Sequence, residues 1–216
     1  MNPSPVRALL SGVVVAATVV VIVGVSLLPF LNSVWVGFEQ DRSGAPALTG
    51  FNSDQVRAVT DGVLHDLIFG PPEFAQTVDG TAVFGDRERA HLADVRSVLL
   101  AFGALVVLGG LALVNIRLVS HGAAWYRRAV GTGALILAGA VVLGGVVIAL
   151  AFQQAFEVFH QLFFAGGTYT FDPATERLVQ LFPTQFWEET ALAVGVVMLA
   201  ISGVVAWWAL GSRDEA

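Results

Sequence analysis

The sequence predicts an all-α membrane protein, a four-transmembrane-helix bundle with a small mixed α/β extracytoplasmic cap. Two observations lead to this fold class. Of the 216 residues, 56% are hydrophobic and only 13% are charged, whereas a soluble domain averages about 25% charged residues. The chain also holds four apolar runs, each long enough for the roughly 20 residues that a helix needs to cross a bilayer. These runs are Ala8–Phe30, Ser97–Ile116, Ala129–Phe152 and Thr190–Leu210.

The first apolar run is predicted to be a membrane span rather than a cleaved signal peptide. It holds about 23 residues, while the apolar region of a signal peptide holds about 7–15. No clear small-x-small cleavage pattern follows it. We therefore expect residues 1–216 to form a single membrane domain.

Residues 31–93 and 153–188 are expected to form the cap, because the first is too long for a simple connection and the second is rich in polar and aromatic residues. A helix is predicted to begin at Asn52, whose side chain can cap the first turn while Gln55 completes a capping box. Valines and leucines then recur at helical spacing, and Gly70 followed by two prolines would end this helix.

Some segments of the cap have the composition of strands. Val78–Thr81 is predicted to be a tight turn with short strands beside it. Val34–Phe38 and Thr168–Phe171 are also strand-like. A small sheet is therefore expected to join the two parts of the cap.

The arginines set the expected orientation in the membrane. Arg117, Arg127 and Arg128 lie between the second and third spans with no acidic residue beside them, while residues 31–93 hold nine acidic residues and four arginines. The positive-inside rule places both termini and the short loop in the cytoplasm and both long loops outside. No basic stripe accompanies the net charge of −6, so nucleic-acid binding is not indicated.

Two polar segments beside the spans carry the candidate chemistry. In Glu88–Arg96, residues 88, 91 and 94 are spaced to share one helical face. The segment Phe159–Trp187 carries His160 near its beginning, among aromatic residues. His91 and His160 each lie on the order of 10 Å outside the apolar core, at 1.5 Å per helical residue. Because a short loop joins spans two and three, the histidines are expected at one height on adjacent helices, near the lipid headgroups.

The two histidines leave three classes of function open. A base and an acid titrating near neutral pH would suit proton transfer. A pair of axial ligands would hold a haem, and a metal site would need a third ligand. The carboxylates available as that ligand are Glu88, Asp94, Glu157 and Asp172. The third class is a non-catalytic membrane assembly factor. The chain has no cysteine and no HExxH, GxSxG or glycine-rich phosphate motif.

The order and spacing of these segments resemble the lipoprotein intramolecular transacylase (Lit) family of bacterial membrane proteins. Besides the four spans, the resemblance is carried by the ExxHxxDV pattern of Glu88–Val95 and the FHxxFF…LxxLFPxxFW pattern of Phe159–Trp187. It implies a multi-pass enzyme of the bacterial cell membrane with its active site at the outer leaflet. The implied reaction moves the sn-2 acyl chain of a diacylglyceryl lipoprotein to the α-amino group of its N-terminal cysteine, giving lyso-form lipoprotein. Its partners would be diacylated lipoprotein N-termini and membrane lipid, with no cofactor or metal.

This resemblance makes His91 and His160 the expected catalytic pair, without deciding which is the base and which the acid. A carboxylate would orient the His91 ring, as in a serine-protease triad, and a donor would stabilise the oxyanion. The candidate carboxylates are Glu88 and Asp94, and the candidate donors are Arg89, Tyr169 and a backbone N–H near Gly166 and Gly167. The expected wall of an acyl-chain groove is Phe159, Phe163, Phe164, Phe171, Phe182, Phe186 and Trp187.

Overall fold

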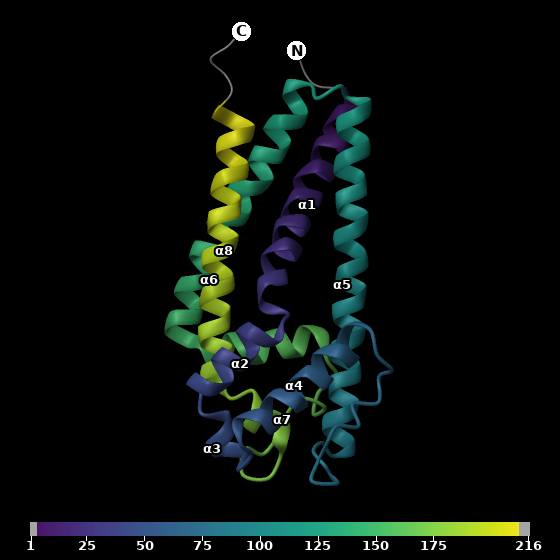
Figure 1. Cartoon of the computed structure of the whole chain (residues 1–216). Helices are drawn as coiled ribbons and strands as arrows, with labels where there is room; N and C mark the ends of the chain where they lie inside the picture. The colour runs from purple at the N-terminus through teal and green to yellow at the C-terminus, as the bar shows by residue number, and fades with distance from the viewer. Residues whose placement is uncertain (1–3, 212–216) are drawn as a thin grey trace. The chain divides into compact units, whose positions relative to one another are not determined.

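The computed structural model describes residues 4–211, which are almost entirely helical (Figure 1). Four helices in this range are long and apolar enough to cross a membrane, and each contains one of the predicted apolar runs. They are α1 (Pro5–Leu27, followed by the 3-10 turn Leu28–Phe30), α5 (Asp86–Val119), α6 (Ala124–Phe163) and α8 (Thr184–Gly211). The four predicted spans are therefore confirmed.

The chain divides into two compact units. We call residues 4–27, 102–146 and 193–211 the bundle unit, and Leu28–Ala101 with Val147–Leu192 the cap unit. The long helices α5, α6 and α8 each contribute residues to both units. The two histidines predicted to be catalytic both belong to the cap unit.

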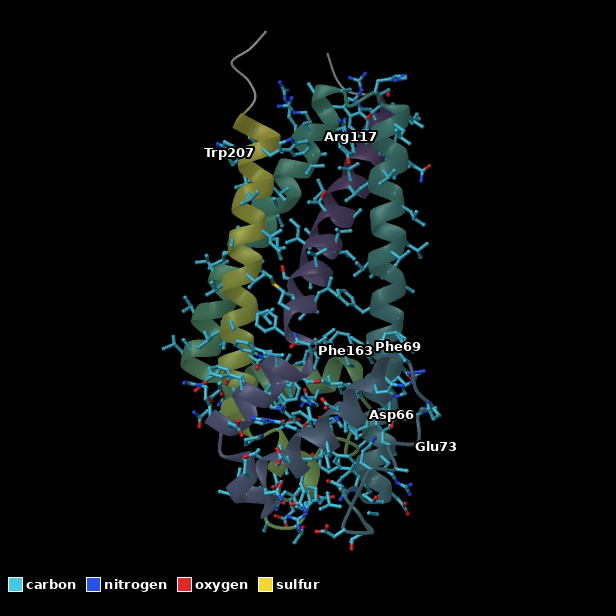
Figure 2. The ribbon with its side chains drawn as sticks, viewed as in Figure 1. Asp66, Phe69, Glu73, Arg117, Phe163 and Trp207 are labelled. Atoms are coloured by element: carbon cyan, nitrogen blue, oxygen red, sulfur yellow. The ribbon has the colours of Figure 1, made fainter. Side chains whose placement is uncertain are left out.

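The bundle unit is held together by small and branched apolar side chains. One buried cluster combines Ile22 of α1 with Ala134 and Leu137 of α6 and Ala206 of α8. At Gly133 an added Cβ would meet the carbonyl oxygen of Val15 at 2.8 Å, so α1 and α6 approach closely only with glycine there. Arg117 of α5 and Trp207 of α8 lie toward the same end of this unit (Figure 2).

The cap unit is built around α4 (Ser53–Ile68). Besides the 3-10 turn and its parts of α5, α6 and α8, this unit contains α2 (Ser33–Arg42), α3 (Ala45–Thr49), β1 (Thr77–Val78), β2 (Thr81–Ala82) and α7 (Arg177–Leu181). One apolar core joins α4, the hairpin region, α5 and α7. The buried members of this core are Val56, Val59, Val63, Phe74, Val83, Phe84, Leu92, Leu178 and Leu181. The valines of α4 therefore recur at the predicted helical spacing and form part of this core.

The local predictions around α4 are confirmed. The Asn52 side chain accepts from the Gln55 N–H at 2.9 Å, and the Gln55 side chain accepts from the Asn52 N–H at 3.0 Å, which completes the capping box. The predicted turn also forms between β1 and β2. Asp79 and Gly80 have φ values of 51° and 77°, and two positive φ values at the central positions are what a type I′ hairpin requires.

The predicted sheet between the two parts of the cap is wrong. Val34–Phe38 lies in α2, because the Asn32 side chain accepts from the N–H groups of Val34 and Trp35 at 2.9 and 3.1 Å and so caps a helix. Thr168–Phe171 is an irregular segment rather than a strand. In the first segment a helix cap outweighs the strand composition, and the second segment forms no regular structure.

Side chains, rather than a sheet, join the two parts of the cap. Gln40 donates to the carbonyl oxygen of Leu181 at 3.1 Å, and Arg177 donates to that of Thr49 at 2.8 Å. Such bonds link α2 and α3 to α7 across about 130–140 residues of sequence. These contacts depend on tertiary packing and leave no local pattern in the sequence.

Helix α6 continues past its apolar run to Phe163, as its period predicts, but it is not uniform. Ala151 has non-helical backbone angles (φ −151°, ψ 48°), which divide α6 into two helical pieces. The second piece, residues 152–163, carries His160.

Candidate active site

The structure brings the two predicted catalytic histidines together. His91 lies near the beginning of α5, and His160 lies in the second piece of α6. Their imidazole rings are stacked with centroids 6.0 Å apart and planes inclined by 24°. Both are buried, with 6% of His91 and 8% of His160 exposed. Each ring is therefore largely removed from solvent and lies beside the other.

The surroundings of His91 keep it neutral. Burial, and to a smaller extent nearby His160, lower the pKa of His91 to about 4, although Asp94 offsets part of the shift. His91 precedes the apolar run of its helix, so it is outside the membrane-spanning stretch. Its Nδ1 atom is buried and has no hydrogen-bond partner within residues 4–211. A neutral imidazole with an unpaired buried nitrogen can bond an incoming polar group.

The hydrogen bond of His160 fixes its tautomer. Nδ1 of His160 lies 2.8 Å from the carbonyl oxygen of Phe156, one helical turn earlier. A carbonyl oxygen can only accept, so Nδ1 carries the proton and donates it. In the neutral ring the lone pair is then on Nε2, which makes Nε2 the atom able to accept a proton from a substrate.

An aromatic cage surrounds the pair. Phe164 contacts both rings, with centroids 4.8 Å from His91 and 5.5 Å from His160. Phe171 lies 5.5 Å from His91, and Phe159 lies 5.5 Å from His160. These three members of the predicted groove wall therefore contact the histidines directly. Their low polarity accounts for the desolvation of His91.

The other predicted groove residues lie outside the immediate cage. Phe163 contacts Phe159 at 4.9 Å and has 51% of its surface exposed near the end of α6 (Figure 2). Phe182, Phe186 and Trp187 form a second ring cluster with centroids 5.1–6.2 Å apart.

Phe156 joins this second ring cluster to the histidine pair. Its ring lies 6.1 Å from Trp187 and 4.2 Å from His160. Phe156 was absent from the predicted site, although its position four residues before His160 in a helix could have indicated it.

Glu88 does not orient the His91 ring. Its Oε2 accepts from the Gly85 N–H at 2.7 Å, and its Oε1 accepts from the Leu178 N–H at 2.6 Å. It therefore caps the beginning of α5 and fixes the start of α7. Asp94 is exposed and acts on His91 through its charge.

The predicted oxyanion donors differ in what they contact. Tyr169 lies 5.0 Å from the His160 ring, and its hydroxyl donates to Glu157 at 2.9 Å. That hydrogen bond raises the pKa of Tyr169. Arg89 pairs with Asp86, and its buried Nε has no partner within the described residues. Gly166 and Gly167 are exposed.

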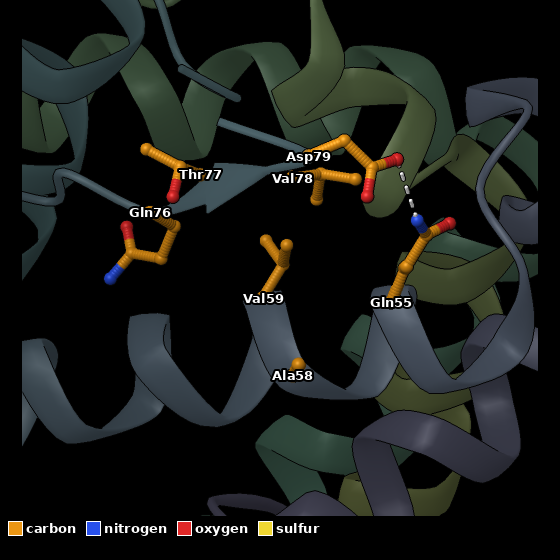
Figure 3. Close-up of a pocket in the computed structure, with 7 residues that line it drawn as sticks. All are labelled: Gln55, Ala58, Val59, Gln76, Thr77, Val78 and Asp79. Atoms are coloured by element: carbon orange, nitrogen blue, oxygen red, sulfur yellow. Dashed lines mark hydrogen bonds between the residues drawn. The ribbon is translucent and has the colours of Figure 1, made fainter. Parts of the chain in front are cut away.

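Two further features bear on which ligands the cap unit could hold. Within residues 4–211, no group of three His, Cys, Asp or Glu side chains is arranged to hold a metal ion. A cavity of about 240 Å³ lies between α4 and the hairpin, where Gln55 donates to Asp79 at 3.1 Å (Figure 3). Its lining is Gln55, Ala58, Val59, Gln76, Thr77, Val78 and Asp79, none of which is a candidate site residue.

Four long apolar helices and a buried histidine pair in an aromatic cage define a multi-pass membrane protein with a site suited to proton transfer. The sequence profile of the lipoprotein intramolecular transacylase Lit matches residues 11–187. The chain therefore belongs to the Lit family, as its sequence motifs predict. This membership selects the acyltransferase among the three classes of function.

Solved structures support the same fold. The membrane integral lipoprotein intramolecular transacylase Lit from Bacillus cereus is 19% identical, with a TM-score of 0.79 over 99% of this chain and 100% of that chain. A variant of that protein with one histidine changed to arginine gives a TM-score of 0.71 over 94% of this chain and 90% of that chain, also at 19% identity. The variant with alanine at that histidine gives a TM-score of 0.67 over 94% of this chain and 92% of that chain, also at 19% identity. A comparison with curated proteins gave no match.

Proposed function

We propose that this chain transfers the sn-2 acyl chain of a diacylglyceryl lipoprotein to the α-amino group of the lipoprotein's N-terminal cysteine. Family membership assigns the transacylase activity. In this reaction the bond between the acyl carbon and the glycerol oxygen breaks, and a bond from that carbon to the α-nitrogen forms. One proton moves from nitrogen to the leaving oxygen, so no cofactor is consumed.

The buried pair of imidazoles, with centroids 6.0 Å apart, is the observation that carries this proposal. His160 presents an Nε2 lone pair, so we assign it the role of accepting the amine proton and delivering it to the glycerol oxygen. An α-amino group titrates near 7.7–8, so a positioned base can remove its proton at little cost. His160 is thus the general base and then the general acid.

We assign the neutral His91 to the ester carbonyl oxygen. A tetrahedral intermediate develops negative charge on that oxygen, and a donor in a dry site stabilises it without first having to reorganise. His91 is neutral because its pKa is about 4, and its buried Nδ1 lacks a partner within the described residues. A neutral imidazole serves as such a donor in other enzymes.

The aromatic cage fits the substrate we propose. Acyl chains are apolar, and Phe159, Phe164 and Phe171 present apolar rings next to the histidines. Diacylated lipoprotein N-termini would enter this cage from the membrane surface. The low polarity of the cage also strengthens each hydrogen bond made within it.

The arginine asymmetry supports a site at the outer leaflet, with residues 31–93 and 153–188 as an extracytoplasmic cap and both termini in the cytoplasm. Accessible tags would test this arrangement in intact cells. A tag inserted near Gly44 should be labelled from outside, and one near Ser120 should not. The opposite pattern would contradict the arrangement.

Mass spectrometry of lipoprotein N-termini tests the function itself. The chain is expressed in a host that makes diacyl lipoproteins and has no transacylase of its own. We expect N-acyl, S-monoacylglyceryl cysteine to appear only when the chain is present. Unchanged diacyl lipoproteins beside normal amounts of the protein would contradict the proposal.

A further inference from the structure

One short segment covers both histidines. We call residues 164–171, between α6 and α7, the strap. Its Phe164 and Phe171 rings lie 4.8 and 5.5 Å from His91, and its Tyr169 ring lies 5.0 Å from His160. This cover helps to leave the two imidazoles only 6% and 8% exposed. Movement of this cover would give an ester and an amine access to the imidazoles.

Arg87 holds the strap from outside, in addition to the hydrogen bond of Tyr169 and the packing of Phe171 against the α4 core. Arg87 donates to the carbonyl oxygen of Thr170 at 2.8 Å and pairs with Glu176 at 3.5 Å. Its guanidinium also lies 5.6 Å from the centroid of Phe171, the ring that covers His91. The Arg87 side chain is 60% exposed. Water therefore competes for these contacts, and the clasp they form is one that can open.

The backbone of the strap suits such opening. The segment forms no strand, and a single backbone turn bond among its residues joins the Thr168 N–H to the Ala165 carbonyl oxygen at 3.2 Å. Gly167 has a φ of +84°, and an added Cβ at Gly166 or Gly167 would meet nothing within 4 Å. The strap thus has free space at a pair of glycines and is held mainly by side chains.

A closed strap has a chemical consequence for an acyl ester. The base that takes a proton from an amine can equally take one from water, and water would then cleave the ester to a free fatty acid and the glycerol hydroxyl. Transfer to the amine requires that water be kept from the acyl carbon. An aromatic cover over the reacting groups excludes water.

We propose that Arg87 is a positioning residue that holds the strap closed over the reacting ester and so directs the acyl chain to the amine instead of to water. This inference rests on the proposed transacylase function. Arg87 acts through Thr170 and Phe171 and touches neither histidine in the contacts described. Its role is therefore in the choice of acceptor rather than in proton transfer.

The ratio of two products tests this inference. A synthetic diacylglyceryl lipopeptide is incubated with the purified chain in lipid. Mass spectrometry then measures the N-acyl product against the hydrolysis products, which are free fatty acid and S-monoacylglyceryl lipopeptide with a free α-amino group. Arg87→Gln should raise the hydrolysed share about tenfold, since hydrogen bonds to a charged group no longer hold the strap. Arg87→Lys keeps the charge, and its hydrolysed share should lie between those of the wild type and Arg87→Gln.

Arg57→Gln is the matched control. It removes the same charge from an exposed arginine that pairs with Asp41 at 3.4 Å, far from the strap in sequence. Its product ratio should equal that of the wild type. An unchanged ratio in Arg87→Gln, or an equal loss of both products, would overturn the role of Arg87. A wild-type chain that makes no N-acyl product would contradict the proposed function and, with it, this inference.

Discussion

The cap unit contains two regions that are built in different ways. Around α4, nine buried apolar side chains form a core, and a capping box and a type I′ turn satisfy the backbone locally. Around the histidines, two polar rings are buried among aromatic side chains, and the covering strap is held by side-chain bonds. The first region is arranged for stability. The second places a neutral imidazole, whose Nδ1 has no partner within residues 4–211, against another imidazole, which suits the binding of a polar substrate group.

The largest expected effect is on the stability of the α4 region. Phe74 is fully buried in its core, and Phe74→Ala should lower the free energy of unfolding by about 3–5 kcal/mol. Thermal unfolding of the purified protein in lipid measures this loss. Activity per folded molecule should stay near that of the wild type. A specific loss of activity without a loss of stability would show that the two regions are not distinct in the way described.

The next effect is on catalysis at His91. His91→Leu removes the proposed oxyanion donor and should reduce turnover by about 10²–10³-fold. His91→Gln keeps a donor N–H and should lose less. Stability near neutral pH should change little in either variant, because the wild-type imidazole already has a buried nitrogen without a partner within residues 4–211. Turnover of a diacyl lipopeptide at matched protein amounts makes the measurement. Equal turnover in the Leu and Gln variants would contradict the donor role.

A smaller effect concerns pH. The pKa of His91 is about 4 in the folded protein and about 6.5 in an unfolded chain, so the unfolded state binds more protons between these values. Its contribution to stability is complete above pH 6.5 and is lost as the pH falls toward 4. The loss is at most about 3 kcal/mol, at about 1.4 kcal/mol per pKa unit.

His91→Gln should remove this part of the pH dependence. Unfolding of the wild type and the variant is compared from pH 7.5 down to 4.5, so that groups common to both cancel. The two curves should lie close together near pH 7.5 and separate as the pH falls, because only the wild type loses the contribution of His91. Parallel curves would show that His91 titrates alike in the folded and unfolded states.

The smallest effect is at the cap of α4. Asn52→Ala removes the capping box and should cost about 1 kcal/mol of stability, with the acyl-transfer rate unchanged. Asn52→Asp keeps a capping oxygen and should retain most of the stability. Thermal unfolding of both variants distinguishes them. A change in the ratio of acyl-transfer products would link this helix to the site, contrary to the comparison.

The same two regions differ in how far sequence alone could predict them. Asn52, Gln55 and the turn at Asp79 follow rules that act over a few residues, and the structure has each as predicted. The four spans were equally predictable, because bilayer thickness and residue polarity set them. The sheet through Val34–Phe38 failed because a capping residue just before the segment outweighed its strand composition.

At the histidines, only part of the arrangement could be predicted. The pairing of His91 with His160 followed from helix spacing and a short connecting loop. The hydrogen bond of Glu88 to the Leu178 N–H could not be predicted, because Leu178 lies 90 residues away. The hydrogen bond of Arg87 to Thr170 could not be predicted either, because Thr170 lies 83 residues away. The different tasks that we propose for the two imidazoles rest on burial and on one hydrogen bond, neither of which is visible in the sequence.

The central claim is that His160 moves the proton that accompanies acyl transfer. The most direct measurement uses a lipopeptide labelled in its sn-2 acyl chain and follows the label into the amide, for the wild type and for His160→Asn. The variant should accumulate normally in the membrane and transfer the label about 10²–10⁴-fold more slowly. The chain's other two histidines, His65 and His121, are exposed and serve as controls, so His65→Ala and His121→Ala should remain near the wild-type rate. A His160→Asn protein that accumulates normally and transfers the label at the wild-type rate would contradict the claim.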